Sequence, residues 1–343
     1  MIKAAFIGTG NIAGSHLRYL KTRTDVAMVG LADPNRENAK KRQTEFGGDV
    51  FADYQSMLDQ VKPDAVWVCT PPTVRKEPLL ACAERGLPVF CEKPVERQVK
   101  VGEAITRELI RRQAHVQVGY VFRSMPVIAQ LREAMRDDHI HLIQSYYGCG
   151  ISLTMTQPPW FYDKAKSGGA LVDQATHNFD LLRNLFGEVK EIRGMANNPV
   201  RPKNGNYTID ETLGVMFLFV NGMIASHLHT WVGDSWRNEI ALSGEKRFYR
   251  LLPARGQLIV EDRNTRSAHD PLDEKTGAGN PATPFRFEQE RRSIYEYENE
   301  QYLRQVVSGD WSQNPCSYED GLKTLSLTMA CDRAIRCGRA TLA

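Results

Sequence analysis

The sequence predicts an α/β protein in which a doubly wound parallel sheet is followed by an α+β domain with a large, mainly antiparallel open sheet. Three observations support this prediction. Short apolar runs alternate with helical stretches over the first third of the chain. A glycine-rich turn follows the first apolar run. Beyond about residue 140, apolar runs follow one another with turns between them, which is typical of antiparallel strands.

The first third of the chain carries both helix and strand patterns. Short runs of buried residue types predict strands, and stretches with apolar residues every three or four positions predict helices. The expected strands are residues 3–7, 26–32, 65–69, 89–91 and 116–120. The expected helices are residues 12–22, 37–46, 54–60, 77–85 and 101–113. This alternation favours parallel strands, because each helix carries the chain back to the same end of the sheet.

The rest of the chain is richer in strands. We expect strands at residues 141–148, 189–196, 212–220, 223–231, 239–244 and 257–261. We expect helices at residues 126–136, 298–308 and 318–337. Asn221-Gly222 lies between two of these strands and is a strong hairpin signal. At roughly 150 residues per domain the 343 residues predict two domains, which we place at residues 1–121 and 122–343.

Composition limits the classes of function. The formal net charge of +3, without a dense run of Lys or Arg, is too small for a nucleic-acid partner. No apolar run approaches the roughly 20 residues of a membrane span, so we expect no membrane partner. The seven cysteines are odd in number, scattered and without a C-x-x-C pair, which disfavours disulfides and a zinc site. We therefore expect a cytoplasmic protein without a bound metal.

The segment Gly8-Thr9-Gly10-Asn11-Ile12-Ala13 follows the first expected strand and opens the first expected helix. This order is the dinucleotide-binding fingerprint of a Rossmann fold. Gly8 permits the tight turn, Gly10 lets the backbone approach a pyrophosphate, and Ala13 lets the helix lie close to the sheet. The N-terminus of the helix offers free N–H groups to the phosphates.

Asp33 ends the second expected strand, 25 residues after Gly8. Its carboxylate is placed to accept hydrogen bonds from the ribose hydroxyls and to repel the extra phosphate of NADP, which favours NAD as the cofactor. Arg36 is the counter-argument, because a guanidinium binds phosphate well. In the alternative interpretation, Asp33-Pro34-Asn35 only caps the next helix.

The stretch from Gly168-Gly169 to Gly187 predicts a glycine-led helix with Asp173 and His177 four residues apart. Residues with this spacing share one helix face, so the carboxylate can orient the imidazole. Imidazole titrates near neutral pH, which makes His177 a candidate general base. The same arrangement is also compatible with an ordinary amphipathic helix.

His227, His229 and Trp231 alternate along one expected strand and therefore share one face of a sheet. A metal site there would need a third ligand, and none is evident. We interpret this face as a subunit interface.

Several of these segments together resemble the Gfo/Idh/MocA oxidoreductases. The resemblance covers nearly the whole chain, and it rests on the glycine loop, Asp33 and four further segments. Those segments are Thr70-Pro71-Pro72, Glu92-Lys93-Pro94, Gly119-Tyr120 with Arg123, and Gly168-Gly169 through Asp173 and His177. Two positions depart from the family pattern. Arg75 stands where a histidine is frequent, and Ala175 stands where a glycine is common.

The resemblance implies a reaction and a set of partners. Such proteins mostly oxidise or reduce a carbinol carbon of sugars, inositols and related polyols, and they usually oligomerise through the open sheet. We therefore expect a sugar or polyol substrate and a homodimer or homotetramer. The resemblance also implies that Thr70, Pro71, Glu92 and Lys93 lie at the cofactor.

Hydride transfer needs a base for the hydroxyl proton and a group that stabilises the developing alkoxide. We expect Lys93 and His177 to share these tasks on one face of the nicotinamide, with Asp173 holding the imidazole. The family assigns proton transfer sometimes to the lysine and sometimes to the histidine, so that division stays open. Tyr120, Arg123 and Trp160 are further candidates for contact with the substrate.

Two other functions stay open at this point. Some relatives use NAD transiently to cleave glycosidic bonds by oxidation and elimination, and they would keep the same residues. Other relatives bind the nucleotide without catalysis and regulate partners. Such a regulator should have lost the lysine or the histidine, whereas this chain keeps both Lys93 and His177.

Overall fold

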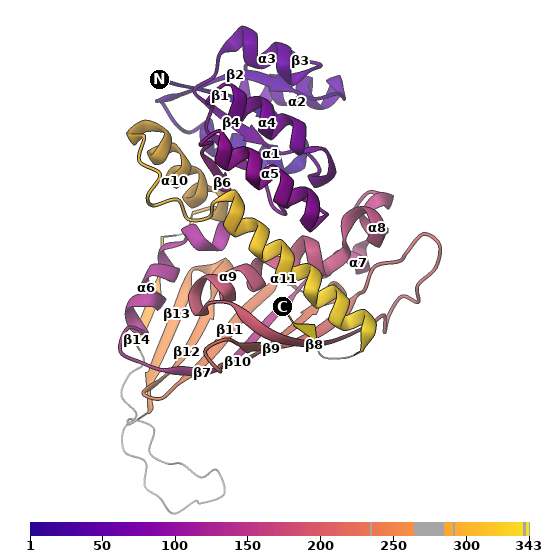
Figure 1. The fold of residues 1–343 in the computed structure, drawn as a ribbon, viewed down its shortest axis with the longest axis vertical. Helices are drawn as coiled ribbons and strands as arrows, with labels where there is room; N and C mark the ends of the chain where they lie inside the picture. Colours follow the sequence, from indigo (N-terminus) through magenta and orange to yellow (C-terminus); the bar gives the residue numbers. More distant parts are fainter. Residues whose placement is uncertain (234, 264–284, 291, 339–340, 343) are drawn as a thin grey trace, which may run out of the picture. The chain divides into compact units, whose positions relative to one another are not determined.

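The computed structural model describes residues 1–233, 235–263, 285–290, 292–338 and 341–342. The chain forms two compact units (Figure 1). The first unit consists of Met1–Ser124 with Arg292–Ser326, and the second of Met125–Arg291 with Leu327–Ala343. Residues 292–326, which we expected in the second domain, therefore fold with the first unit.

The first unit contains a six-stranded sheet whose strand pairs are all parallel, in the order β3-β2-β1-β4-β5-β6. This is the strand order of a Rossmann fold, so the prediction for this half of the chain is confirmed. The strands are β1 (Ile2–Ile7), β2 (Val26–Ala32), β3 (Asp49–Phe51), β4 (Ala65–Val68), β5 (Val89–Cys91) and β6 (Val116–Val118). The helices are α1 (Asn11–Leu20), α2 (Arg36–Phe46), α3 (Tyr54–Val61), α4 (Lys76–Glu84), α5 (Val99–Arg111) and α10 (Ile294–Ser308).

Helix α10 joins the first unit through buried polar and aromatic contacts. The Trp67 indole N–H donates to Asn299 Oδ1 at 2.8 Å, and Gln117 Nε2 donates to the Glu298 carbonyl at 3.0 Å. Tyr302 is fully buried and lies edge-on to Trp67, with ring centroids 4.9 Å apart. These partners are far apart in the sequence, so local patterns could not assign α10 to its unit.

The second unit contains a nine-stranded sheet in the order β14-β13-β12-β11-β7-β10-β9-β8-β15. Only the pair β7 and β10 is parallel, which confirms the predicted, mainly antiparallel sheet. The strands are β7 (Ile140–Gly148), β8 (Val189–Asn197), β9 (Thr212–Phe219), β10 (Ile224–Thr230), β11 (Arg237–Gly244), β12 (Arg247–Leu252), β13 (Gln257–Asp262), β14 (Phe285–Glu288) and β15 (Thr341–Leu342). The helices of this unit are α6 (Pro126–Ala134), α7 (Ile151–Thr154), α8 (Lys164–Ser167) and α9 (Thr176–Phe186), and α11 (Tyr318–Cys337) ends in it.

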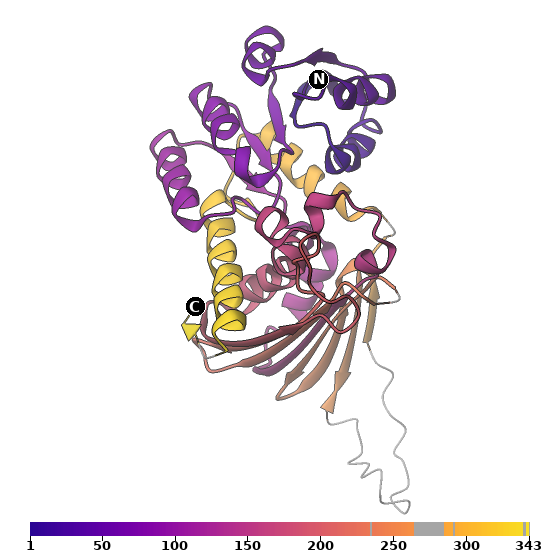
Figure 2. The same cartoon turned by 90° about the vertical axis from the view of Figure 1, so that its right-hand side faces the viewer.

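Helices cover one face of this sheet, as Figure 2 shows. Phe179 of α9 lies edge-on to Phe217 of β9 and to His227 of β10, with ring centroids 5.2 Å apart in both pairs. Along β9 and β10 buried residues alternate with exposed or half-exposed ones, because successive side chains of a strand point to opposite faces. The buried side chains therefore form the core beneath the helices.

The assignment of His227, His229 and Trp231 to a subunit interface is wrong. All three are 0–1% exposed and belong to the buried interior of the second unit. His227 Nδ1 lies 2.9 Å from Ser145 Oγ. Burial lowers the pKa of His227 to about 3 and that of His229 well below its usual value. Alternation along the strand showed that the three residues share a face, but not that helices cover this face.

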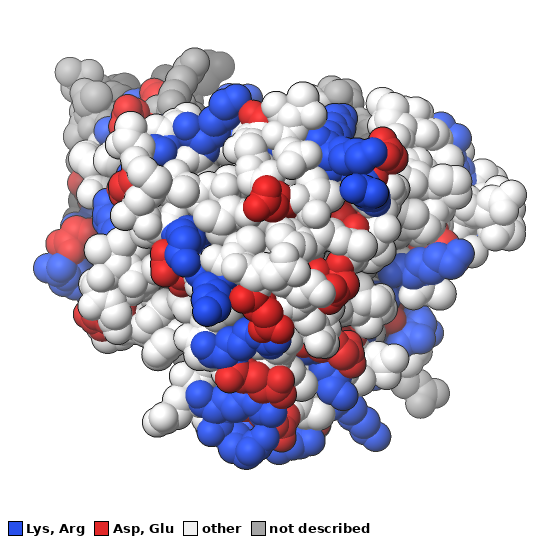
Figure 3. Space-filling model, turned by 90° about the horizontal axis from the view of Figure 1, so that it is seen from above, with Lys and Arg blue, Asp and Glu red and all other residues white. Residues whose placement is uncertain are grey.

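The described residues contain no helix that is long and apolar enough to cross a membrane. On the face drawn in Figure 3, Lys and Arg side chains are interspersed with Asp and Glu. The described part of that face forms no continuous basic surface, in keeping with the small net charge.

Candidate active site

The predicted cofactor residues of the first unit follow the carboxyl ends of its parallel strands. Gly8 follows β1, Asp33 follows β2, Thr70 follows β4, and Lys93 follows β5. Strand order reverses between β1 and β4, where ligands of doubly wound sheets bind. The fold thus brings the ends of four separate sequence segments to the same edge of one sheet.

The glycine loop has the shape that a dinucleotide requires. Gly8 has φ +85°, and a Cβ there would lie 2.9 Å from the backbone of Cys69 and Thr70. A Cβ on Gly10 would meet no described atom within 4 Å, so the space beside this residue is open. Helix α1 begins at Asn11 without a side-chain cap, which leaves its first N–H groups to a ligand such as a pyrophosphate.

Asp33 is buried and already holds the glycine loop. Its Oδ2 accepts from the backbone N–H and the hydroxyl of Thr9, both at 2.9 Å, and its Oδ1 accepts from Asn35 N at 2.8 Å. Asn35, not Asp33, caps α2 by accepting from Glu37 N at 3.1 Å. Because each carboxylate oxygen has two lone pairs, Oδ1 keeps one for a ribose hydroxyl. Arg36 is exposed at the first position of α2.

Arg42 supports the loop from within the protein, and sequence patterns did not single it out. Its guanidinium is 8% exposed and donates to the carbonyls of Thr9 at 3.3 Å and Gly10 at 3.0 Å. A Cβ on Gly14 would lie 2.8 Å from this guanidinium, so Gly14 leaves room for it. The only sequence signal was an arginine on the otherwise solvated face of a helix.

Thr70 and Pro71 complete this edge of the sheet. The Thr70 hydroxyl oxygen is buried and has no hydrogen-bond partner among the described residues. A buried hydroxyl without a partner is costly, and a bound ligand would relieve that cost. Pro71 follows in an exposed position. Together with the open space at Gly10, the hydroxyl supports a dinucleotide site here.

Lys93 is the accessible residue of a buried loop. From Cys91 to Glu96 the described residues are all buried except Lys93, which is half-exposed. The Lys93–Pro94 peptide bond is cis. The loop therefore presents one ammonium at the carboxyl edge of the sheet while its neighbours lie in the interior.

A chain of hydrogen bonds leads from the core to the Lys93 backbone. The Trp67 indole, which can only donate, gives its proton to Asn299 Oδ1 at 2.8 Å. The amide nitrogen of Asn299 must then donate to His16 Nδ1 at 2.8 Å, so the ring proton sits on Nε2 and is donated to Glu92 Oε1 at 2.9 Å. Glu92 Oε2 accepts from the Lys93 N–H at 3.0 Å. Glu92 thus acts through the Lys93 backbone.

Burial alone would raise the pKa of the Glu92 carboxyl. The hydrogen bond from His16 and the positive charges of Lys93 and Arg75 outweigh burial, and the pKa is lowered. The pKa of Glu298 is raised well above its usual value by burial and by the charge of Glu92. The pKa values of the two carboxyls are therefore shifted in opposite directions.

His16, Glu92 and Glu298 are also a group whose ligand atoms lie within 4.8 Å of one another, as a metal site would require. The hydrogen-bond directions disfavour that use. His16 Nδ1 accepts from Asn299 and Nε2 carries the proton, so neither nitrogen offers a free lone pair. We interpret the group as a hydrogen-bonded part of the interior.

In the second unit, Asp173 and His177 occupy a buried helical segment. From Gly168 to Arg183 every residue is buried except these two, which are half-buried. The segment is not a regular α-helix. A π-helical turn, η4 (Leu171–Ala175), precedes α9, and such turns are frequent at functional sites. The predicted acid and the predicted base are therefore the most accessible side chains of this segment.

The other polar residues of this segment are bound in the interior. Gln174 Oε1 accepts from Trp231 Nε1 at 2.9 Å, and Asn178 Nδ2 donates to Ser145 Oγ at 2.8 Å. Gly169 has φ +67°, and a Cβ there would lie 3.3 Å from the Ile209 side chain. A glycine is therefore required at position 169 by its positive φ and by the close contact with Ile209.

The three further candidates for substrate contact have different surroundings. Tyr120 is 2% exposed, in the interior of the first unit. The Arg123 side chain is buried too, donating to the Pro315 carbonyl at 2.9 Å and pairing with Asp320. These contacts account for Arg123 without a substrate. Trp160, in the short helix η3 (Pro159–Tyr162) of the second unit, is 50% exposed.

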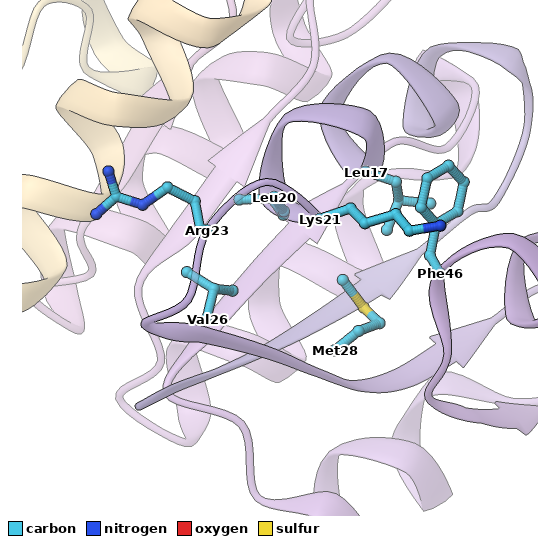
Figure 4. Close-up of a pocket in the computed structure, with 7 residues that line it drawn as sticks. All are labelled: Leu17, Leu20, Lys21, Arg23, Val26, Met28 and Phe46. Carbon is cyan, nitrogen blue, oxygen red and sulfur yellow. The ribbon is translucent and has the colours of Figure 1, made fainter.

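A pocket of about 160 Å³ lies elsewhere in the first unit (Figure 4). It includes the first residue of β2, Val26, and so lies at the amino end of that strand, away from the carboxyl edge. Its lining residues are Leu17, Leu20, Lys21, Arg23, Val26, Met28 and Phe46. It does not belong to the candidate site.

Comparisons with known proteins identify the family and the fold. The family model described as "Oxidoreductase family, NAD-binding Rossmann fold" matches residues 2–120, and "GFO/IDH/MocA C-terminal domain" matches residues 128–250. The chain is 24% identical over 339 residues to a myo-inositol 2-dehydrogenase of Thermotoga maritima, with 97% of this chain and 96% of the relative covered. It is 27% identical over 218 residues to a scyllo-inositol 2-dehydrogenase (NAD(+)) of Bacillus subtilis, with 62% of each covered. A solved levoglucosan dehydrogenase, in complex with NADH and levoglucosan, has the same fold with a TM-score of 0.82, 20% identity and 99% of each chain covered.

Proposed function

This chain belongs to the Gfo/Idh/MocA family of oxidoreductases, and on that basis we propose that it transfers a hydride between NAD and a carbinol or ketone carbon of a sugar, an inositol or a related polyol. One observation carries the proposal. The groups needed for proton handling stay accessible where their neighbours are buried: Lys93 within Cys91–Glu96, and Asp173 with His177 within Gly168–Arg183.

Each residue has a distinct task in the proposed reaction. NAD, bound by the loop from Gly8 to Ile12 and by Asp33, would be the hydride acceptor. The Lys93 ammonium stabilises the alkoxide that develops as the hydroxyl proton leaves. His177 accepts that proton as general base, and Asp173 orients its ring. Trp160 offers an aromatic face to the C–H surface of a sugar.

A substrate panel tests the proposal. Myo-inositol, scyllo-inositol, levoglucosan, free sugars and sugar acids are each supplied with NAD or NADP, and reduced nicotinamide is followed by absorbance. We expect turnover with at least one polyol. Cleavage of a glycoside without net reduced cofactor would instead identify oxidation followed by elimination. Tight NAD binding without turnover of any compound would identify a regulator.

Replacing Asp33 with Ser is expected to erode the preference for NAD. The change removes a charge-assisted hydrogen bond to the ribose worth about 1.5–3 kcal/mol, which is about ten- to a hundredfold in the Kd of NAD. It also removes the repulsion of the NADP phosphate. Titration of both cofactors into the protein, followed by tryptophan fluorescence, measures the ratio of the two Kd values.

Thr9→Val serves as the comparison, because it removes one donor to Asp33 and leaves the carboxylate in place. It should weaken both cofactors alike and keep their ratio. An unchanged ratio in Asp33→Ser would show that the carboxylate only holds the loop.

We further propose that the open face of the second sheet joins two or more copies of the chain. Large apolar side chains are exposed on four adjacent strands, β7, β10, β9 and β8. They are Leu142, Met195, Met216, Ile224 and Leu228, with 38–76% of each residue exposed. A contiguous apolar patch of this kind marks an interaction surface. A second copy fits because the patch carries little net charge, since Arg193 on β8 is paired with Glu191 two residues earlier.

Leu228→Arg should convert the oligomer to a monomer. Leu228 is 58% exposed and pairs directly with Tyr146 and Gly214 on the neighbouring strands, so a charge here would lie inside the interface. Light scattering after gel filtration measures the mass. Ile110→Arg, at a 61% exposed position of α5, is the matched control and should keep the wild-type mass. A wild-type monomer would contradict the proposal.

The proposed compartment is the cytoplasm. All seven cysteines are free thiols, and all but Cys337 are buried. Burial raises the pKa of Cys91 to about 11 and that of Cys82 to about 12, which keeps these thiols protonated and unreactive.

A further inference from the structure

Arg75 occupies an unusual position in the first unit. It lies between the short helix η1 (Pro72–Val74) and α4, on the connection from β4 to β5, and it is 3% exposed. Its own carbonyl accepts from Leu79 N at 3.0 Å, so its backbone is held by the first turn of α4. It stands where the resembled family frequently has a histidine, and nothing in the proposed reaction so far uses the arginine.

The guanidinium of Arg75 binds backbone carbonyls at the ends of two strands. Nε and Nη2 donate to the Thr70 carbonyl, after β4, at 3.0 and 2.6 Å. Nη1 donates to the carbonyls of Glu92 and Pro94, after β5. The two Nη1 acceptors are the residues immediately before and after Lys93. One buried side chain therefore links the Thr70 segment to both sides of the Lys93 residue.

The geometry of the guanidinium explains why arginine suits this place. It is planar and carries five N–H donors in a fixed fork, four of which are used here. A lysine ammonium has three donors on one nitrogen, and a neutral histidine has a single donor. Neither can satisfy carbonyls on opposite sides of the fork at the same time. Arg75 thus ties the carbonyl that follows β4 to the carbonyls that follow β5.

The Lys93 backbone is held by two independent groups. Arg75 binds the carbonyls on either side of it, and Glu92 Oε2 accepts its N–H at 3.0 Å. A fixed backbone limits the directions in which a long, flexible side chain can place its ammonium.

We propose that Arg75 is a positioning residue that sets the direction of the Lys93 ammonium by binding the carbonyls of Glu92 and Pro94. The inference rests on the proposed function of Lys93 in hydride transfer. It assigns a task to the position at which this chain departs from the family histidine. It predicts that loss of Arg75 lowers the rate of the chemical step and leaves the glycine loop and its affinity for NADH intact.

The test compares Arg75→Lys and Arg75→Ala with the wild-type protein. We expect kcat on the best polyol of the panel to fall roughly ten- to a hundredfold, the loss typical of a reacting group misplaced by about 1 Å. The Kd of NADH should stay within about twofold, a change of about 0.4 kcal/mol. Added guanidinium ion should restore part of kcat in Arg75→Ala and none in Arg75→Lys, where an ammonium fills the site.

Arg85→Ala is the matched control, because Arg85 lies at the other end of α4 and binds Asp59 and the Ala81 carbonyl. It should change neither kcat nor Kd. A fall in melting temperature with unchanged kcat in the Arg75 variants would show that the residue only stabilises the fold. Guanidinium that restores the melting temperature of Arg75→Ala but not its kcat would lead to the same conclusion. If Arg75→Ala does not fold, the kcat and the Kd of NADH of Arg75→Lys alone test the proposal.

A second measurement does not depend on turnover. The rate at which acetic anhydride acetylates Lys93, relative to Lys100, is measured by mass spectrometry in each variant. We expect this ratio to change in both Arg75 variants and to return toward the wild-type ratio when guanidinium is added to Arg75→Ala. An unchanged ratio would overturn the proposal. If wild-type protein turns over no polyol, the proposed function fails, and the labelling still decides the task of Arg75.

Discussion

Lys93→Met is expected to lose roughly a thousandfold in kcat while the Kd of NADH changes little. Methionine keeps most of the length and the apolar stem of lysine, so the buried neighbours Glu92 and Pro94 should stay in place. It removes the only charge that the loop from Cys91 to Glu96 presents to solvent. Stopped-flow measurement of a single turnover, with NADH binding measured separately, distinguishes the chemical step from cofactor affinity.

Lys100→Met is the control for this substitution, since Lys100 is exposed at the start of α5. It should turn over at the wild-type rate. A Lys93→Met protein with normal kcat would remove Lys93 from the chemistry. A protein with normal kcat at saturation but a raised Kd of NADH would restrict Lys93 to cofactor binding.

His177→Ala is expected to lose roughly a hundredfold or more in kcat, the contribution typical of a general base. The side chain is half-buried at the start of α9, and alanine is a good helix former, so the fold should tolerate the change. Added imidazole should restore part of the rate, because a small base can replace a missing one. His139→Ala, at an exposed position of the same unit, should behave as wild type.

The double variant Lys93→Met with His177→Ala decides whether the two residues serve one step. If both act on the same proton, the combined loss should be far smaller than the product of the single losses. Losses that multiply would show independent tasks.

Asp173→Asn should give a smaller loss in kcat than His177→Ala, since asparagine keeps a hydrogen-bond acceptor for the ring.

Much of the fold follows from local patterns in the sequence. The glycine loop, the alternation of strands with helices and the Asn221-Gly222 hairpin were predicted and are found. Strands β3, β12, β14 and β15 were missed, and the first two have local reasons. Strand β3 is only the three residues Asp49–Phe51, and β12 includes Arg247 and Arg250, which interrupt its apolar run. The hydrophobic pattern is too short or too broken at these places to indicate a strand.

The site was predicted less completely than the fold. Sequence patterns singled out Lys93, Asp173 and His177, and the structure leaves these three accessible within buried segments. They did not indicate the π-helical turn before His177, whose hydrogen-bond pattern has no distinct side-chain signature. They gave no reason to choose Arg42, and they marked Arg75 only as a departure from the family pattern, because a buried arginine and a surface arginine look alike in a sequence.

What the sequence determined by itself is the alternation of strands and helices, the turns at Gly8 and at Asn221-Gly222 and the residue types that carry the proposed chemistry. These depend on near neighbours in the chain, so a local pattern is sufficient. The tertiary structure alone decided which face of the second sheet is covered, which nitrogen of His16 carries the proton and what Arg75 holds. Each of these depends on partners distant in sequence, as His16 and Asn299 are 283 residues apart. A hydrogen bond over that separation exists only after the chain has folded.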